Sequence, residues 1–187
     1  MADPLFRGPE VDLAAILEAR EARVARRLRA QELLRQPTLA LSLVFPGPVK
    51  LCPAAQRIAD AARATLAERF DAHGWTITRH HDEDTLTGPE ALFSIDIVPT
   101  TLKAEMVALE ESHPLGRLWD LDVHDASGTA LSRRDIGQPP RHCLLCNTPA
   151  HGCTRSRAHS LDELRVAISG LLGQAEGLAP ASRGGKP

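Results

Sequence analysis

Residues 118–123, with the sequence LWDLDV, alternate apolar and acidic side chains. Successive side chains of a β-strand point to opposite faces, so this pattern predicts a strand with one apolar and one acidic face. The sheet that holds this strand must carry a hydrophobic core on one face. On the other face it must offer solvent or a cation to Asp120 and Asp122, whose carboxylates share that side.

Periodicity and Pro or Gly boundaries predict the other elements. Helices are expected at residues 13–36, 54–73 and 100–112 and from residue 161 onward, and strands at 38–45, 75–78, 91–98 and 129–132. Asp12 and Ser160 should cap the first and last helices. A polar connection is expected at 82–89, and a structured loop without helix or strand at 133–159. The first helix should dock through the apolar face formed by Leu13, Ile16, Leu17, Val24 and Leu28.

The order of these elements predicts an α+β domain, with helices packed on a mixed β-sheet. The chain has 187 residues, 43% of them hydrophobic, which is enough for a packed core. One domain is therefore expected over residues 1–175, followed by a disordered C-terminal tail at 176–187, which is rich in Gly, Ala, Pro and Ser.

Net charge and hydropathy indicate which classes of partner and which cellular location to expect. The 22 basic and 24 acidic residues give a net charge of −2, so nothing indicates nucleic acid or an anionic membrane as a partner. No signal peptide or membrane-spanning run is evident, and a cytoplasmic protein is expected. In a reducing cytosol, cysteines are poor candidates for disulfides.

The acidic pair has the pattern of a divalent-cation site. Two carboxylates on one face of a strand can share Mg²⁺, which in phosphoryl and nucleotidyl transfer neutralises phosphate oxygens. The same pattern would also fit the exposed face of an edge strand. Residues before and after the pair add phosphate-binding candidates: Gly116, Arg117, Arg133, Arg134 and, less strongly, Lys50.

Some of these residues have simpler interpretations. Gly116 could end a helix, and Trp119 fits core packing better than base stacking. Asp135 could be a third metal ligand or a base, but an ion pair with a neighbouring arginine is the preferred interpretation. Cys52 is most simply a small core residue.

A second metal site is indicated by the segment Cys143-x2-Cys146-x6-Cys153-x5-His159. Three thiolates and one imidazole can close a tetrahedral zinc site, whose role would be structural because four protein ligands leave no open position. His142 and His151 are alternative nitrogen donors. Buried free thiols would produce the same composition, so both interpretations stay open.

The segments SHPLGRLWDLDV (112–123) and LSRRDIGQPPRHCLLC (131–146), followed by Cys153 and His159, closely resemble the apo-citrate lyase phosphoribosyl-dephospho-CoA transferases, the citrate lyase holo-acyl-carrier-protein synthases. The similarity extends upstream through FPGPVK (45–50) and the arginine-rich first helix. It covers nearly all of the chain except its two ends. Gly116 followed by Asp-x-Asp also looks like a reduced nucleotidyltransferase signature, which is an analogy at the level of the fold.

This resemblance implies a transferase that acts on the apo acyl carrier (gamma) subunit of citrate lyase. A serine of that subunit would attack the α-phosphate of 2'-(5''-triphosphoribosyl)-3'-dephospho-CoA and release diphosphate. Asp120 and Asp122 would be the catalytic residues that bind Mg²⁺, while Gly116 and the arginines would hold the triphosphate. The resemblance assigns no catalytic duty to residues 143–159, called here the cysteine-rich segment, and names no general base.

Three alternatives remain open at the level of sequence. The acceptor could be the carrier protein of malonate decarboxylase, whose related transferase uses the same donor. A general nucleotidyltransferase would use the same aspartates with another donor, such as ATP. A zinc-stabilised module could instead bind a carrier protein without catalysis. The arginines of the first helix are a candidate carrier dock, although a solvated face balanced by glutamates explains them as well.

Overall fold

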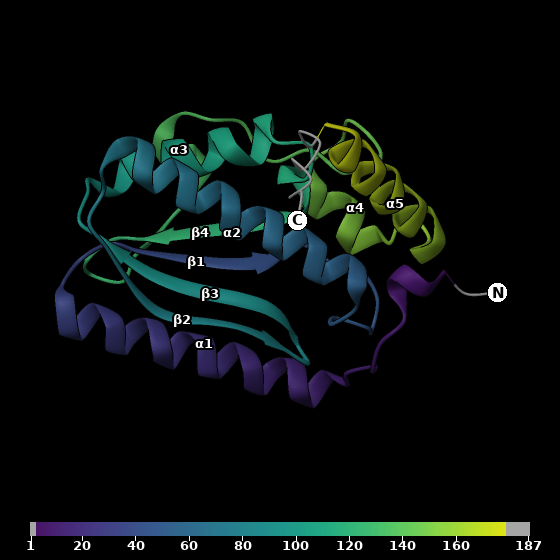
Figure 1. Cartoon of the computed structure of the whole chain (residues 1–187), viewed down its shortest axis with the longest axis horizontal. Helices are drawn as coiled ribbons and strands as arrows, with labels where there is room; N and C mark the ends of the chain where they lie inside the picture. Colours follow the sequence, from purple (N-terminus) through teal and green to yellow (C-terminus); the bar gives the residue numbers. More distant parts are fainter. Residues whose placement is uncertain (1–2, 179–187) are drawn as a thin grey trace, which may run out of the picture.

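The computed structural model describes residues 3–178, which form an α+β fold around one five-stranded sheet (Figure 1). The sheet has the order β2-β3-β1-β4-β5. Its strands are β1 (Thr38–Leu43), β2 (Ile77–Thr85), β3 (Gly88–Ile95), β4 (Trp119–His124) and β5 (Ala130–Leu131).

The prediction of a mixed sheet is wrong, because every pairing in the sheet is antiparallel. The order of the strands explains the difference. The connection through α2 leaves β1 and β2 pointing the same way, but β3 folds back from β2 and lies between them. In the same way, β1 separates β3 from β4. Strands of the same direction exist in this sheet, but none are neighbours.

The main helices lie close to their predicted positions. They are α1 (Leu13–Leu34), α2 (Pro53–His73), α3 (Pro99–Ser112) and α5 (Leu161–Leu178). The Asp12 carboxylate accepts the Ala15 N–H at 2.8 Å, and the Ser160 hydroxyl accepts the Glu163 N–H at 3.2 Å, so both predicted N-caps are confirmed.

Helices α2 and α3 cover one face of the sheet, and α1 lies on the other (Figure 1). The hydrophobic core lies under α2 and α3, where the apolar positions of the strands point. Trp119 is fully buried there, and its indole N–H donates to the Ile58 carbonyl at 3.1 Å. Core packing is therefore confirmed for Trp119, and its ring is not available to a ligand.

The predicted docking face of α1 is wrong. Leu13, Leu17, Val24 and Leu28 are all exposed, while Ala30 and Gln31 are buried. The reason lies in the sheet, because the face that α1 covers carries the alternate, polar side chains of the strands. Arginines can pair with that surface and leucines cannot, so the helix turns its arginine side toward the sheet.

Two segments hold more regular structure than predicted. Strand β2 continues to Thr85 and meets β3 at Gly88, so most of the predicted connection at 82–89 is a tight hairpin. The predicted loop at 133–159 contains the 3₁₀ turn η3 (Arg133–Ile136) and the short helix α4 (Ala150–Ser156). Two further turns, η1 (Pro4–Phe6) and η2 (Gly116–Leu118), precede α1 and β4.

The predicted tail at 176–187 begins inside α5, which extends to Leu178. Residues 179–187 lie outside the described part of the chain, so the tail stays a prediction. Among the described residues, no helix combines the length and the apolarity that crossing a membrane requires.

Candidate active site

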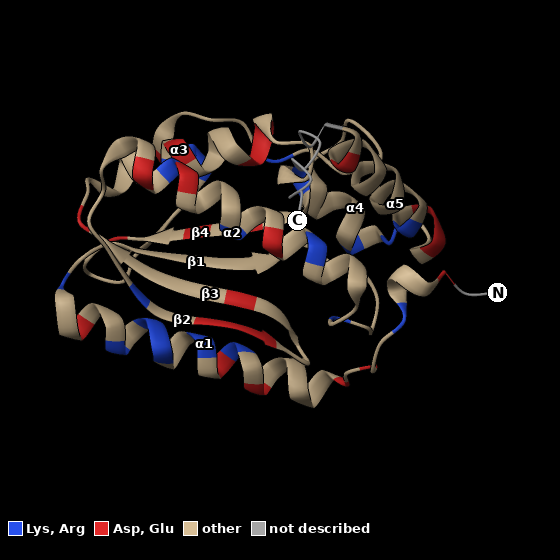
Figure 2. Ribbon diagram, viewed as in Figure 1, with Lys and Arg blue, Asp and Glu red and all other residues tan. Residues whose placement is uncertain are grey.

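A cavity of about 530 Å³ lies between α1 and the polar face of the sheet. Strand β4 supplies Asp120, Asp122 and His124, three alternate residues that face it together. Figure 2 shows the basic bands of α1 beside acidic segments of the sheet. The basic residues that line the cavity are Arg20, Arg23, Arg26 and Arg27 from α1 and His81 from β2.

The environment of Asp120 disfavours its charge. Burial, followed by the neighbouring Asp122 carboxylate, raises the pKa of Asp120 to about 6, although the guanidinium of Arg141 acts in the opposite direction. Two carboxylates that repel each other in a partly buried place are a donor set that fits a divalent cation, because the cation would relieve the repulsion. The acidic pair therefore meets the chemical requirement for Mg²⁺.

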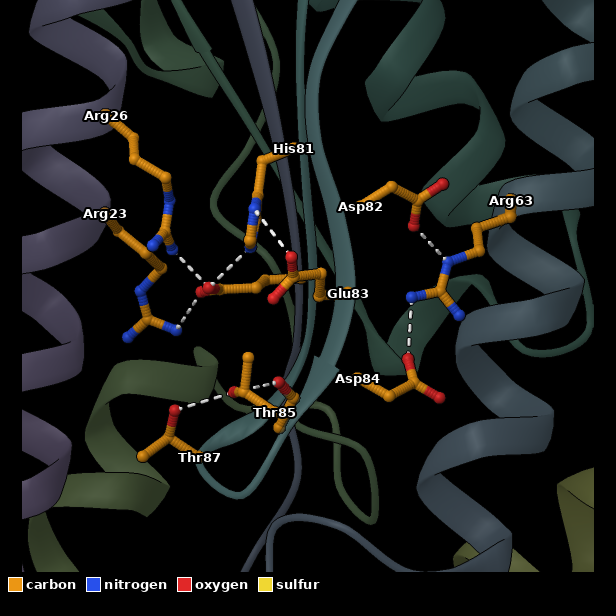
Figure 3. A network of polar contacts seen from close by, with 11 residues as sticks. Arg23, Arg26, Arg63, His81, Asp82, Glu83, Asp84, Thr85 and Thr87 are labelled. Carbon is orange, nitrogen blue, oxygen red and sulfur yellow. Dashed lines mark hydrogen bonds and ion pairs between the residues drawn. The ribbon is translucent and has the colours of Figure 1, made fainter.

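Buried Glu90 of β3 holds α1 on this face. It forms an ion pair with Arg26 and lies 3.6 Å from Arg23 and 3.0 Å from the Nε2 atom of His81. Figure 3 shows Arg23 and Arg26 reaching toward β2 from α1, while Arg63 of α2 reaches its other side. Three of the four arginines in the cavity thus have partners, since Arg27 contacts Gln31 and the Gly128 carbonyl.

Arg20 differs from the other three arginines. Its guanidinium makes no hydrogen bond or ion pair with any residue that the structure describes, yet Arg20 lines the cavity that contains the aspartates. A guanidinium without a protein partner at a cavity wall is available to an anion, and phosphate suits its planar set of donors.

Strand β5 pairs only with Val123 and His124 of β4. At Leu121, side chains of α3 supply the hydrogen bonds that the β4 backbone needs on this outer edge. The Glu110 carboxylate accepts the Leu121 N–H at 3.1 Å, and the Lys103 ammonium donates to the Leu121 carbonyl at 3.1 Å. Both side chains are buried, so they replace a missing strand at the point where the aspartates project.

Arg133, a predicted phosphate ligand, belongs to this edge. Its guanidinium lies 2.7 Å from Glu110 and 2.5 Å from Glu111, and Arg141 lies 2.5 Å from Glu110. Glu110 therefore accepts from both arginines. Arg133 stabilises the support of β4 and does not line the cavity between α1 and the sheet.

Gly116 and Arg117 connect neighbouring segments. A side chain at Gly116 would come within 2.5 Å of the Leu109 carbonyl oxygen, so the glycine allows η2 to pack directly on the end of α3. The Arg117 guanidinium donates to the carbonyls of His142 and Cys143, the latter at 2.6 Å. It ties the cysteine-rich segment to the start of β4.

The remaining predicted site residues lie apart from the aspartates. Arg134 is exposed on η3. It lines neither the cavity under α1 nor a second cavity that lies beside the cysteine-rich segment. The Lys50 ammonium donates to the Phe45 carbonyl at 2.5 Å, and burial lowers its pKa. Asp135 accepts from the Ser132 N–H and hydroxyl, both at 2.7 Å, and so caps η3.

The four predicted zinc ligands do come together. One ligand atom from each of Cys143, Cys146, Cys153 and His159 lies within 4.8 Å of the other three. The Cys146 sulfur is 3.4 Å from the sulfur of Cys153 and 3.4 Å from Nε2 of His159. Ligands of a tetrahedral zinc ion are about 3.8 Å apart for Zn–S bonds near 2.3 Å, so the cluster has the size of a metal site.

The chemistry of the cluster also favours a metal. Hydrogen bonds from the Thr148 hydroxyl and N–H, and then from His159, lower the pKa of Cys146 to about 6. A thiolate is the form that binds zinc. Of the alternative donors, His142 points its Nδ1 atom to the Asn147 carbonyl at 2.9 Å, and His151 is exposed on α4 outside the cluster.

Comparison with known proteins identifies the family of this chain. The family model described as apo-citrate lyase phosphoribosyl-dephospho-CoA transferase (CitX) matches residues 11–175. The chain belongs to this family. Proteins of that name from Escherichia coli O9:H4 (strain HS) and Shigella flexneri serotype 5b (strain 8401) are 37% and 36% identical to it over 162 residues. In both comparisons the match covers 87% of this chain and 88% of the relative.

The cavity also contains residues that the sequence analysis did not connect with the aspartates. His124 follows the aspartates at the same two-residue spacing on β4, so the alternation alone could have included it. Burial lowers its pKa, and its Nδ1 atom has no hydrogen-bond partner among the described residues. No local signal connects His81 or Arg20 with the aspartates, because only the tertiary fold brings β2 and α1 to this face.

Proposed function

We propose that this protein transfers the 2'-(5''-phosphoribosyl)-3'-dephospho-CoA group from 2'-(5''-triphosphoribosyl)-3'-dephospho-CoA to a serine of the apo acyl carrier (gamma) subunit of citrate lyase. The family supplies the class of donor and acceptor. We assign the reaction to the cavity under α1 because Asp120 and Asp122 share it with the arginines of that helix. The side chain of one of them, Arg20, has no partner among the described residues.

The residues of the cavity have distinct tasks in this reaction. Asp120 and Asp122 would hold Mg²⁺, which supplies positive charge to the phosphate oxygens when it is bound. Arg20 would bind the phosphates that leave, and the charge-assisted hydrogen bonds would strengthen as negative charge develops on the diphosphate. Arg23 and Arg26 contribute positive potential while they remain paired with Glu90.

The transfer is a substitution at the α-phosphorus. The serine oxygen forms a bond to phosphorus, and the bond to the oxygen bridging the α- and β-phosphates breaks. The electron pair of that bond leaves with diphosphate, and the proton of the serine hydroxyl is released to solvent. The product is a phosphodiester between carrier and prosthetic group. This is chemistry of the nucleotidyltransferase type, and we extend that proposal to the arrangement of the aspartates on β4.

We also propose that the cluster of Cys143, Cys146, Cys153 and His159 holds a structural zinc ion. Support comes from the spacing of the four ligand atoms and the lowered pKa of Cys146. Four protein ligands fill a tetrahedral shell, so the ion would organise the segment and would not bind substrate.

Intact-mass spectrometry of the apo carrier subunit tests the function. With donor, Mg²⁺ and the wild-type protein, the carrier should gain the mass of the phosphoribosyl-dephospho-CoA group, and with Asp120→Asn it should gain none. Failure of the wild-type protein with a competent citrate lyase carrier would contradict the proposal. Modification of the malonate decarboxylase carrier in its place would correct the acceptor.

Arg20→Gln tests the place of the leaving phosphates. It should lower kcat/KM for the donor about tenfold or more, the order expected for one charge-assisted hydrogen bond. Arg29→Gln is a matched control, because Arg29 is exposed on the same helix and outside the cavity. Equal activity of the two variants would remove Arg20 from the site.

A further inference from the structure

A second cavity, of about 750 Å³, lies beyond the ends of β1 and β4. Its size is typical of cavities that bind small molecules. It is bounded by residues 44–47, by η2, by the cysteine-rich segment and by the facing sides of α4 and α5. Apolar side chains make up much of its wall, among them Val44, Phe45, Leu144, Leu161 and Leu164.

The charged residues of this second cavity are all basic. Arg117, Arg141 and Arg157 line it together with two histidines, and no Asp or Glu is among its lining residues. Arg117 is held by backbone carbonyls and Arg141 by Glu110. The Arg157 guanidinium, by contrast, makes no hydrogen bond or ion pair with a described residue. A wall that combines apolar surface with several cations fits an anionic ligand that also has large uncharged parts.

The second cavity adjoins the aspartates along the same two strands. Ser42 lies opposite Asp120 in the β1–β4 register and lines the first cavity. Two residues further along, the Val44 N–H donates to the Leu118 carbonyl at 2.9 Å, and both residues line the second cavity. Two residues of extended chain span about 7 Å.

We propose that the second cavity binds the dephospho-CoA end of the donor, an inference that rests on the proposed function. The diphosphate that leaves and the arm that is retained must extend from the α-phosphorus in different directions. The arginines of α1 lie over the aspartates on one side, and the second cavity opens at the strand ends. The retained arm contains a diphosphate, which suits the arginines, and adenine and pantetheine groups, which suit the apolar wall.

In this arrangement, the cysteine-rich segment forms part of the wall that faces the ligand. Cys143, Cys153 and His159 belong both to the cluster of four ligands and to the wall of the second cavity. The cluster therefore shapes the surface that faces the retained arm. A segment with little regular structure can then form a binding wall, because its four ligands lie together and Arg117 of η2 donates to its backbone carbonyls.

Dephospho-CoA itself is a direct probe, because it lacks the triphosphate and needs neither Mg²⁺ nor the carrier. Calorimetric titration into the full-length protein should show binding. Thr154→Trp should abolish it by filling the cavity, since Thr154 is an exposed lining residue of α4. Ser156→Trp, on the same helix but outside the lining, should bind normally. Arg157→Gln should weaken binding about tenfold, and Arg155→Gln should not.

The outcomes separate this inference from the proposed function. If the wild-type protein modifies the carrier while Thr154→Trp and Ser156→Trp bind dephospho-CoA equally, the function stands and the inference is overturned. If dephospho-CoA binds with the expected dependence on Thr154 and Arg157 but no carrier is modified, the second cavity is supported and the acceptor or the reaction is wrong. Absence of any binding by a wild-type protein that is active also overturns the inference.

Discussion

At the scale of single residues, the same residue type serves different purposes in neighbouring places. Arg133 pairs with Glu110 and Glu111 and supports the edge of β4, whereas Arg20 has no partner among the described residues and lines the candidate active site. Spacing along the chain cannot separate these roles, because a guanidinium becomes structural or available according to which carboxylates the fold places beside it.

Asp120 is the residue for which function and stability should conflict. Its pKa in the folded protein is raised from 3.8 to about 6, so the folded state binds a proton more tightly than the unfolded state. Ionisation therefore costs stability, and the cost grows as pH rises from about 4 through 6. Asp120→Asn should stabilise the Mg²⁺-free protein at pH 8 by up to about 3 kcal/mol while abolishing turnover.

Urea unfolding at pH 8 and at pH 4, without added Mg²⁺, measures this effect. The difference between wild type and Asp120→Asn should be large at pH 8 and nearly vanish at pH 4, where the wild-type carboxyl is protonated in the folded state. A variant that is less stable than wild type at pH 8 would show that the charge of Asp120 is not a source of strain.

At the scale of elements, the polar face of the sheet determines which side of α1 packs against it. Four of its exposed apolar residues, Leu13, Leu17, Val24 and Leu28, are ones that periodicity assigns to the core side. The helix docks instead through Arg23, Arg26 and Gln31, because Glu90 is buried beneath it and needs partners. This choice of face is what brings arginines over the aspartates.

Arg26→Ala should therefore weaken the attachment of α1. It leaves the buried carboxylate of Glu90 with Arg23 and His81 only, and a loss of about 1–3 kcal/mol in unfolding free energy is expected. Arg29→Ala on the exposed side should change stability by less than about 0.5 kcal/mol. Chemical denaturation of the two variants measures the contrast, and equal stabilities would mean that the ion pair contributes little to docking.

At the scale of the whole molecule, two cavities occupy different parts of the fold and lie next to each other where β1 ends and β4 begins. The sheet and α1 form one, and the cysteine-rich segment with α4 and α5 forms the other. Arg117 and Arg141 lie at this junction. A change in the cysteine-rich segment should accordingly affect donor binding more than the integrity of the sheet.

Metal removal tests this division. Protein purified without chelator should contain about one zinc per chain by elemental analysis, and Cys146→Ser should lose most of it. His151→Ala is the control, because His151 lies outside the cluster. Chelation should lower the melting temperature and weaken dephospho-CoA binding. Equal zinc contents in the two variants would exclude Cys146 as a ligand.

The sequence by itself determined the four long helices, most strands, the shared face of Asp120 and Asp122, the four members of the Cys/His cluster and the family. These follow from local periodicity, capping and close spacing, which depend on neighbours in the chain. The direction of the sheet, the docked face of α1 and the partners of Arg133 were decided by the tertiary structure alone. Each depends on residues far apart in sequence, and the free energy of burying a charge is set by the partner that folding supplies.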